Sequence, residues 1–69
     1  MPSDDSLLEQ AEDWKRKGNE AFQKTEIDEA IRAYSQGLVQ ADRVTPPPVA
    51  LKTALLSNRA MCYLKAMNL

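Results

Sequence analysis

The stretch from Trp14 to Tyr34 constrains the fold more than any other part of this 69-residue chain. Apolar and small residues recur in it at intervals of three and four on either side of a polar break at residues 24–26, which is the spacing of one helix face. Gly18 stands inside the first of these segments, where glycine costs about 1 kcal/mol relative to alanine. A helix that keeps such a glycine needs another backbone to pass close by. The stretch therefore predicts two helices that are joined by a tight turn and cross near Gly18.

The whole pattern predicts an all-α chain, an antiparallel helical hairpin followed by a third helix. Ser6 and Glu9 have the spacing of a capping box, so the first helix is expected to follow a disordered leader at residues 1–5. Thr25 is expected to cap the second helix, and three consecutive prolines are expected to end it. The expected elements, within a domain that covers 6–69, are helices at about 6–23, 27–42 and 49–66 and a Pro-rich connector at 43–48.

The third expected helix is apolar on most of its circumference, which predicts neighbours on two sides. Its apolar residues form two overlapping stripes, Leu51, Ala54, Leu55 and Cys62 on one side and Leu56, Ala60, Tyr63, Leu64 and Met67 on the other. Only the second helix precedes it as a packing partner. The other stripe is therefore expected to be covered by a second copy, by a partner or by the remainder of a longer protein.

The composition argues against nucleic-acid binding, metal binding and catalysis. Nine basic and ten acidic residues give a net charge of −1, which supplies no field to attract nucleic acid. The chain has no histidine and one cysteine, so we expect no zinc site and no internal disulfide. Two isolated glycines form no phosphate loop, and no nucleophile has a partner, so we expect no enzyme and no cofactor. The chain shows no signal peptide and no apolar run of membrane length, so a cytoplasmic protein is expected.

The hairpin resembles the tetratricopeptide repeat, a helix-turn-helix unit of 34 residues. The matching positions are Trp14, Gly18, Ala30 and Tyr34. The chain departs from the family pattern at Lys17, Ala21, Gly37 and Asp42. The later segment SNRAMCYLK resembles the first helix of a following repeat, with Ala60 in the position of Gly18. The resemblance implies a truncated right-handed solenoid with one full repeat and the first helix of a second.

Three polar residues form the candidate site. Lys15 and Asn19 are one turn apart on the first helix, and Asn58 lies in the corresponding helix of the second unit. If these two helices stack side by side, an ammonium and two amides face one groove and can donate hydrogen bonds to a peptide's C-terminal carboxylate. Phe22, one turn beyond Asn19, is expected to form an apolar wall. Each residue taken alone favours a solvated or structural role, and only their joint occurrence within the surrounding sequence indicates a binding site.

The strings KRKGN and SNRA resemble the corresponding segments of dicarboxylate-clamp tetratricopeptide co-chaperones, which bind the Glu-Glu-Val-Asp tails of heat shock proteins 70 and 90. In that family the matching Lys and two Asn contact the terminal Asp, and a third repeat supplies two more basic residues. The resemblance implies a chaperone adaptor that binds an acidic C-terminal tail through a partial clamp. The alternative is a structural fragment with a vestigial clamp that forms homo-oligomers through its third helix.

Overall fold

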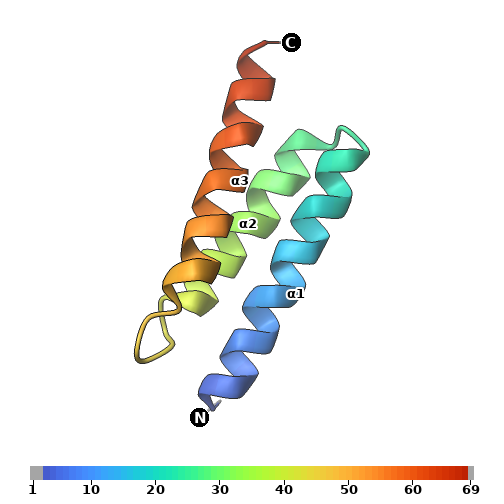
Figure 1. Ribbon diagram of the computed structural model, residues 1–69. Coiled ribbons are helices and arrows are strands. Elements are labelled where there is room, and N and C mark those ends of the chain that lie inside the picture. The colour runs from blue at the N-terminus through green and yellow to red at the C-terminus, as the bar shows by residue number, and fades with distance from the viewer. Residues whose placement is uncertain (1–2, 69) are drawn as a thin grey trace.

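The computed structural model describes residues 3–68 as three α-helices, with no strand in that range. α1 spans Asp4–Gln23, α2 spans Ile27–Ala41 and α3 spans Val49–Met67. α1 and α2 run antiparallel, and α3 turns back to run in the same direction as α1 (Figure 1). The prediction of an antiparallel helical hairpin followed by a third helix is confirmed.

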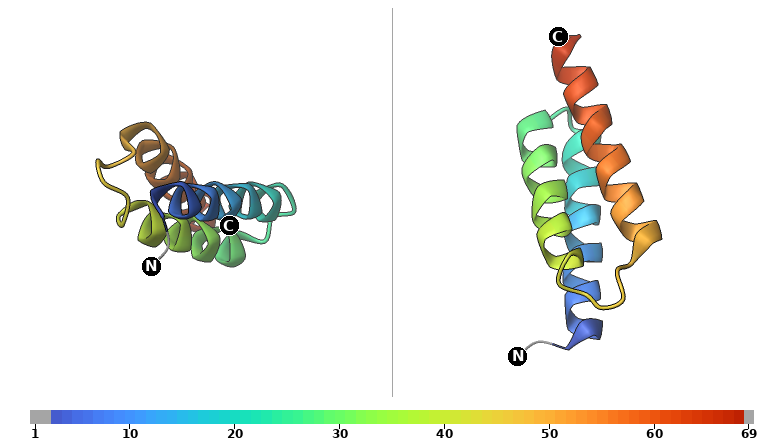
Figure 2. Two further views of the ribbon diagram at one scale, coloured as in Figure 1. Left: turned by 90° about the horizontal axis from the view of Figure 1, so that it is seen from below. Right: turned by 90° about the vertical axis from the view of Figure 1, so that its left-hand side faces the viewer.

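α2 is the central element of this arrangement. It packs against both α1 and α3, whereas α1 and α3 have few contacts with each other. In the right-hand view of Figure 2, α1 is seen between α2 and α3. The buried residues of α2 follow the helical periodicity that the sequence predicts, and they are Ile27, Ala30, Ala33, Tyr34, Gly37, Leu38 and Ala41. The contributions of α1 and α3 to the core include Leu7, Ala11, Leu51, Leu55 and Cys62.

The Tyr34 side chain of α2 packs closely on α1 at Gly18, so the close neighbour of this glycine is an aromatic ring and not the backbone that the sequence predicts. A Cβ atom at this position would lie 2.5 Å from Cε1 and 2.6 Å from Cδ1 of Tyr34, well inside van der Waals contact. The Tyr34 ring is only 2% exposed, so it has no free space into which to move. The glycine is therefore needed for the Tyr34 ring of α2 to lie this close to α1.

The first helix begins earlier than the sequence predicts. Ser3, not Ser6, is the N-cap, and its hydroxyl oxygen accepts a hydrogen bond from the Ser6 backbone N–H at 3.2 Å. Asp4 and Asp5 fill the first turn, where the positive end of the helix dipole favours carboxylates. Residues 3–5 are thus part of the capped helix and not of a disordered leader, whereas residues 1–2 of that leader lie outside the described range.

The turn between α1 and α2 also differs from the prediction. The N–H groups of Thr25 and Glu26 donate to the carbonyls of Phe22 (3.0 Å) and Ala21 (2.9 Å), which is the bond pair of a Schellman motif. Thr25 thereby ends α1 and adopts a φ of 60°, a left-handed conformation that glycine normally supplies. The expectation that Thr25 caps α2 was wrong, because its backbone closes α1. Glu26 is the N-cap of α2, without a side-chain capping bond.

The connector between α2 and α3 is fixed at both ends. Val44 is buried with 6% exposure, which anchors the start of the loop to the core. Lys52 in the first turn of α3 forms an ion pair with Asp42 at 2.8 Å, just after the end of α2. Farther along α3, Arg59 donates a hydrogen bond to the Ser35 hydroxyl of α2 at 3.3 Å. These contacts set the position of α3 along α2.

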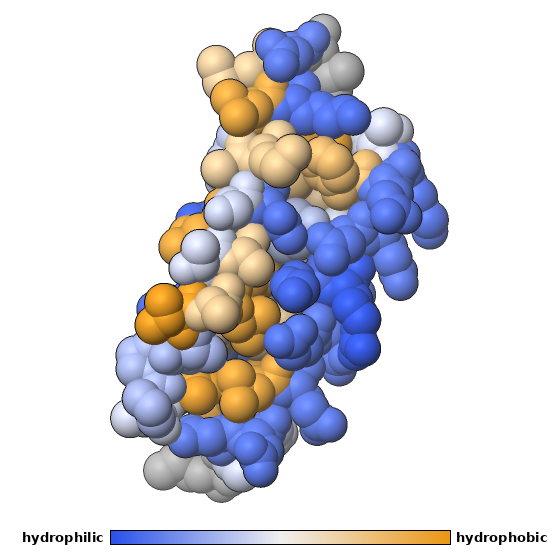
Figure 3. All heavy atoms as spheres, in the orientation of Figure 1, coloured by the Kyte–Doolittle hydropathy of each residue, from blue (hydrophilic) through white to orange (hydrophobic). Residues whose placement is uncertain are grey.

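The surface of α3 remains largely apolar. Figure 3 shows apolar side chains gathered along α3 and polar ones along α1. The large exposed side chains of α3 are Val49, Leu56, Met61, Tyr63, Leu64 and Met67, with exposures of 47% to 82%. Within residues 3–68, no helix is both long and apolar enough to cross a membrane.

The contact at Gly18 generates a prediction about stability. Gly18→Ala should lower the free energy of unfolding by about 1–3 kcal/mol, because the added methyl group overpacks the Tyr34 ring. Gly37→Ala is the matched control. Its Cβ would lie 2.9 Å from Cδ2 of the buried Leu55 and 3.3 Å from Cβ of Trp14, whereas a Cβ at Gly18 meets three ring atoms within 2.8 Å, so Gly37→Ala should cost less than Gly18→Ala. Urea denaturation measures both, and a Gly18→Ala protein as stable as the wild type would contradict the close approach.

The strained turn residue gives a prediction of the opposite sign. Thr25→Gly should raise the free energy of unfolding by about 1 kcal/mol, because glycine adopts the left-handed conformation without the Cβ clash. Thr25→Ala keeps a Cβ atom and should gain less. Thermal and urea denaturation of the three proteins would show this order, and a Thr25→Gly protein less stable than Thr25→Ala would contradict it.

Candidate functional site

A small hollow of about 200 Å³ lies where the three helices meet. It is lined by Asn19, Phe22 and Gln23 of α1, Tyr34 of α2, and Asn58 and Met61 of α3. Three of the four residues expected in the binding site, Asn19, Asn58 and Phe22, therefore lie together. None of the residues that line the hollow is acidic.

The two asparagines are in direct contact. The Asn58 amide nitrogen, Nδ2, donates a hydrogen bond to Oδ1 of Asn19 at 3.3 Å. These residues are 39 positions apart in the chain, and the parallel course of α1 and α3 over α2 brings them together. The contact leaves the amide nitrogen of Asn19 free to donate, since no hydrogen bond from that atom occurs among residues 3–68.

Tyr34 is a third residue in the hydrogen-bond network of Asn19 and Asn58, and the sequence analysis did not predict its role. Its hydroxyl donates to the same Asn19 Oδ1 at 2.5 Å. The sequence identified Tyr34 only as an aromatic position of the hairpin. The sequence could have indicated this bond, because a buried tyrosine hydroxyl usually has a hydrogen-bond partner. Asn19 is next in the chain to the glycine on which the Tyr34 ring packs.

Lys15 lies in a different place from the other predicted residues. It lines a second hollow, also between α1 and α3, together with Leu8 and Glu12 of α1 and with residues of the connector and the first turns of α3. Its ammonium forms an ion pair with Glu12 at 3.8 Å, and its side chain is 30% exposed. Lys15 is four residues before Asn19, so it projects from the same side of α1 one turn away from the hollow.

A second cation approaches the hollow from α3. The Lys65 ammonium lies 5.3 Å from the centre of the Phe22 ring, a cation–π distance. Phe22 lines the hollow, as its position predicted. Its ring also attracts the ammonium group of Lys65. Lys65 was not among the predicted site residues. The sequence could have indicated Lys65, because it follows Asn58 by two helical turns and therefore lies on the same side of α3.

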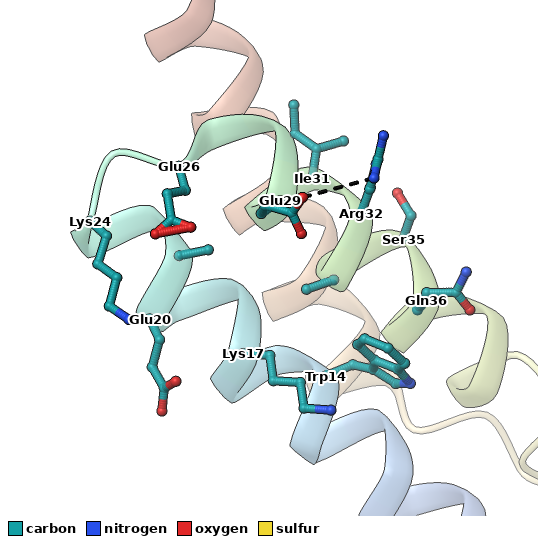
Figure 4. A pocket seen from close by; sticks show the side chains of 12 residues that line it. Trp14, Lys17, Glu20, Lys24, Glu26, Glu29, Ile31, Arg32, Ser35 and Gln36 are labelled. Carbon is teal, nitrogen blue, oxygen red and sulfur yellow. Dashed lines mark ion pairs between the residues drawn. The ribbon is translucent and has the colours of Figure 1, made fainter.

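A larger hollow, of about 1020 Å³, lies elsewhere, between α1 and α2 (Figure 4). Lys17 lies over the Trp14 ring there at 4.6 Å, and Arg32 pairs with Glu29 at 3.8 Å. Three acidic and three basic side chains line it, so its charge favours neither anions nor cations. None of the predicted site residues contributes to it.

Within residues 3–68 no cluster of His, Cys, Asp and Glu side chains has the geometry of a metal site. Comparisons with protein-family models, with curated proteins and with solved structures return no match. The geometry of the site offers amide donors and nearby ammonium groups to an anionic ligand.

The two buried titratable groups next to the site predict a pH dependence. Burial raises the pKa of the Tyr34 hydroxyl, the Cys62 charge raises it further, and the hydrogen bond from Asn58 lowers it in part. Burial also raises the pKa of the Cys62 thiol. Above the pKa values of the unfolded chain, the folded protein therefore holds more protons than the unfolded chain, so its stability falls as pH rises.

Stability should accordingly be constant near neutral pH and decline as the pH rises past the ordinary Cys and Tyr pKa values of about 8.5 and about 10. Tyr34→Phe removes one of the two titrating groups, so its free energy of unfolding should fall less over that range. Urea denaturation at stepped pH tests this. Parallel curves for the wild type and Tyr34→Phe would contradict it.

Proposed function

We propose that this chain is a non-enzymatic protein–protein interaction module that binds the C-terminal carboxylate of an acidic peptide. The observation that carries the proposal is the meeting of Asn19 and Asn58 in one hollow, with Phe22 as its wall. Amide N–H groups suit a carboxylate because they donate hydrogen bonds to it without a competing negative charge. The absence of acidic residues from the lining of the hollow supports the same ligand.

Two ammonium groups fit an acidic ligand of more than one residue. Lys15 lies one turn before Asn19 on α1, and Lys65 lies at the Phe22 ring on the other side of the hollow. A peptide that places its terminal carboxylate at the amides would bring its neighbouring acidic groups within reach of these cations. Phe22 and Met61 offer apolar contact to a side chain next to the terminus.

The partner proposed is the acidic tail of heat shock protein 70 or 90, and the setting is a cytoplasmic chaperone adaptor. Support for a tetratricopeptide-type module comes from the family-like residues of the hairpin and from the course of α3, which runs parallel to α1 as the first helix of a second repeat would. No nucleic acid and no membrane enter the proposal.

A second candidate function, self-association with a vestigial clamp, is favoured by the surface of α3. Leu64 and Met67 are 61% and 82% exposed, and Leu56 and Tyr63 lie on the same apolar side of the helix. Patches of this kind mark interaction surfaces. Sedimentation equilibrium distinguishes the candidates, since self-association gives a mass that rises with concentration and is lowered by Leu64→Glu.

The peptide proposal is tested by titration with a short peptide ending in Glu-Glu-Val-Asp and with its C-terminally amidated twin. The free acid should bind more tightly, and Asn58→Ala should weaken its binding by about 1.5–3 kcal/mol, the value of a hydrogen bond to a charged group. Lys15→Ala should also weaken it, by less, because its ammonium is partly screened by solvent and by Glu12.

Ser57→Ala is the matched control for Asn58→Ala, since Ser57 is exposed on the adjacent position of α3. It should leave the affinity unchanged. Equal affinities of the wild type and Asn58→Ala for the free acid, or equal affinities of the wild type for the acid and the amide, would overturn the proposal.

A further inference from the structure

Tyr34 lines the small hollow where the three helices meet, and its hydroxyl donates a hydrogen bond to Asn19, another lining residue. The ring is 2% exposed and rests on Gly18, so the hydroxyl is held at a fixed place next to Asn19. Its hydrogen bond to Asn19 Oδ1 measures 2.5 Å, against 3.3 Å for the bond from Asn58 to the same oxygen. Tyr34 is thus the nearer of the two donors to that oxygen.

These two bonds determine which way the Asn19 amide faces. An amide oxygen has two lone pairs, and here both accept a hydrogen bond. Rotation of the amide by 180° would set its N–H₂ group against the Asn58 N–H₂ group, which would lose its acceptor, and would force the Tyr34 hydroxyl to change from donor to acceptor, which is costly at a part-buried site. The amide oxygen of Asn19 therefore accepts hydrogen bonds from within the protein, and its N–H₂ group can donate to a ligand.

We propose that Tyr34 is a positioning residue that makes the hollow selective for a carboxylate over a neutral carboxamide. It acts through Asn19: by holding the amide oxygen, it keeps the amide N–H₂ group presented to the ligand. The inference rests on the proposed function, since it concerns how the same hollow recognises a peptide terminus. Its selectivity arises because a carboxylate only accepts hydrogen bonds, whereas a carboxamide must also place its own donors.

Two further features support this role. Burial raises the pKa of the Tyr34 hydroxyl, so the group keeps its proton and remains a donor throughout the physiological pH range. Gly18 admits the ring so closely that a phenylalanine ring would occupy the same space. Removal of the hydroxyl alone therefore changes the hydrogen bonding of Asn19 while the packing of α1 on α2 is kept.

The test compares the wild type with Tyr34→Phe for binding of the Glu-Glu-Val-Asp peptide and its amidated twin. Without the hydroxyl, the Asn19 amide can turn its oxygen to the ligand, which repels a carboxylate and accepts from a carboxamide. The preference for the acid should fall about tenfold, equivalent to about 1.4 kcal/mol. Tyr63→Phe, which removes a hydroxyl from a half-exposed ring of α3, is the matched control and should keep the preference.

The ratio of the two affinities separates positioning from a loss of folding. Partial unfolding of Tyr34→Phe lowers both affinities and leaves their ratio unchanged, so an unchanged ratio overturns the role of Tyr34. A wild type that binds both peptides equally overturns the proposed function instead. In the free protein, the Asn19 side-chain amide signals in ¹⁵N spectra should shift in Tyr34→Phe and not in Tyr63→Phe.

Asn19→Asp provides a second variant that keeps the network. The aspartate oxygens still accept from Tyr34 and Asn58, but no N–H₂ group remains and a negative charge replaces it. This protein should bind the amidated peptide more tightly than the acid, a reversed preference. A retained preference for the acid would show that the Asn19 donors do not face the ligand and would overturn the inference even if Tyr34→Phe does not fold.

Discussion

The packing of the Tyr34 ring on Gly18 is the contact on which the rest of the structure depends. It sets how closely α2 approaches α1, and α2 in turn carries α3, since α1 and α3 have few contacts of their own. The same contact places the Tyr34 hydroxyl beside Asn19, the residue that follows the glycine. One close approach thus serves both the core and the polar site, and a side chain at position 18 would disturb both.

The site is built from groups that the fold has already oriented. Asn19 and Asn58 come from helices that run in parallel (Figure 1), and their side chains are joined by a hydrogen bond of 3.3 Å. Their mutual hydrogen bond and the bond from Tyr34 occupy the acceptor and leave donors. Such preorganisation reduces the ordering cost of binding, because the amides do not have to be fixed when a ligand arrives. The apolar surface of α3 lies beside this polar site and is independent of its hydrogen bonds.

Much of this fold could be predicted from the sequence, because helical periodicity survives in the order of residues. The three helices follow from the spacing of apolar positions, and Gly18 does lie at a close contact between α1 and α2, although its neighbour is the Tyr34 ring and not the backbone that was predicted. Asn19, Asn58 and Phe22 were predicted to share a site, and they line one hollow. The start of α1 was missed because Ser3 and Ser6 both suit an N-cap, and only the geometry of the terminus decides between them. The left-handed Thr25 was missed because glycine is the residue expected there. Residue spacing does not specify the directions of side chains. For this reason the sequence did not predict that Lys15 lies in a separate hollow, that Lys65 lies at the Phe22 ring, or that Tyr34 bonds to Asn19.

The most direct test of this account is an NMR measurement on the isotopically labelled protein in solution. The α protons of Gly18 should show nuclear Overhauser contacts to the ring protons of Tyr34 and a marked ring-current shift, because the ring lies against the glycine backbone. The Tyr34 hydroxyl proton should exchange slowly with water and show contacts to the side chains of Asn19 or Asn58. Gly18 signals at ordinary helical positions without contacts to Tyr34 would contradict the account, since neither the helix crossing nor the orientation of the Asn19 amide would then have its proposed cause.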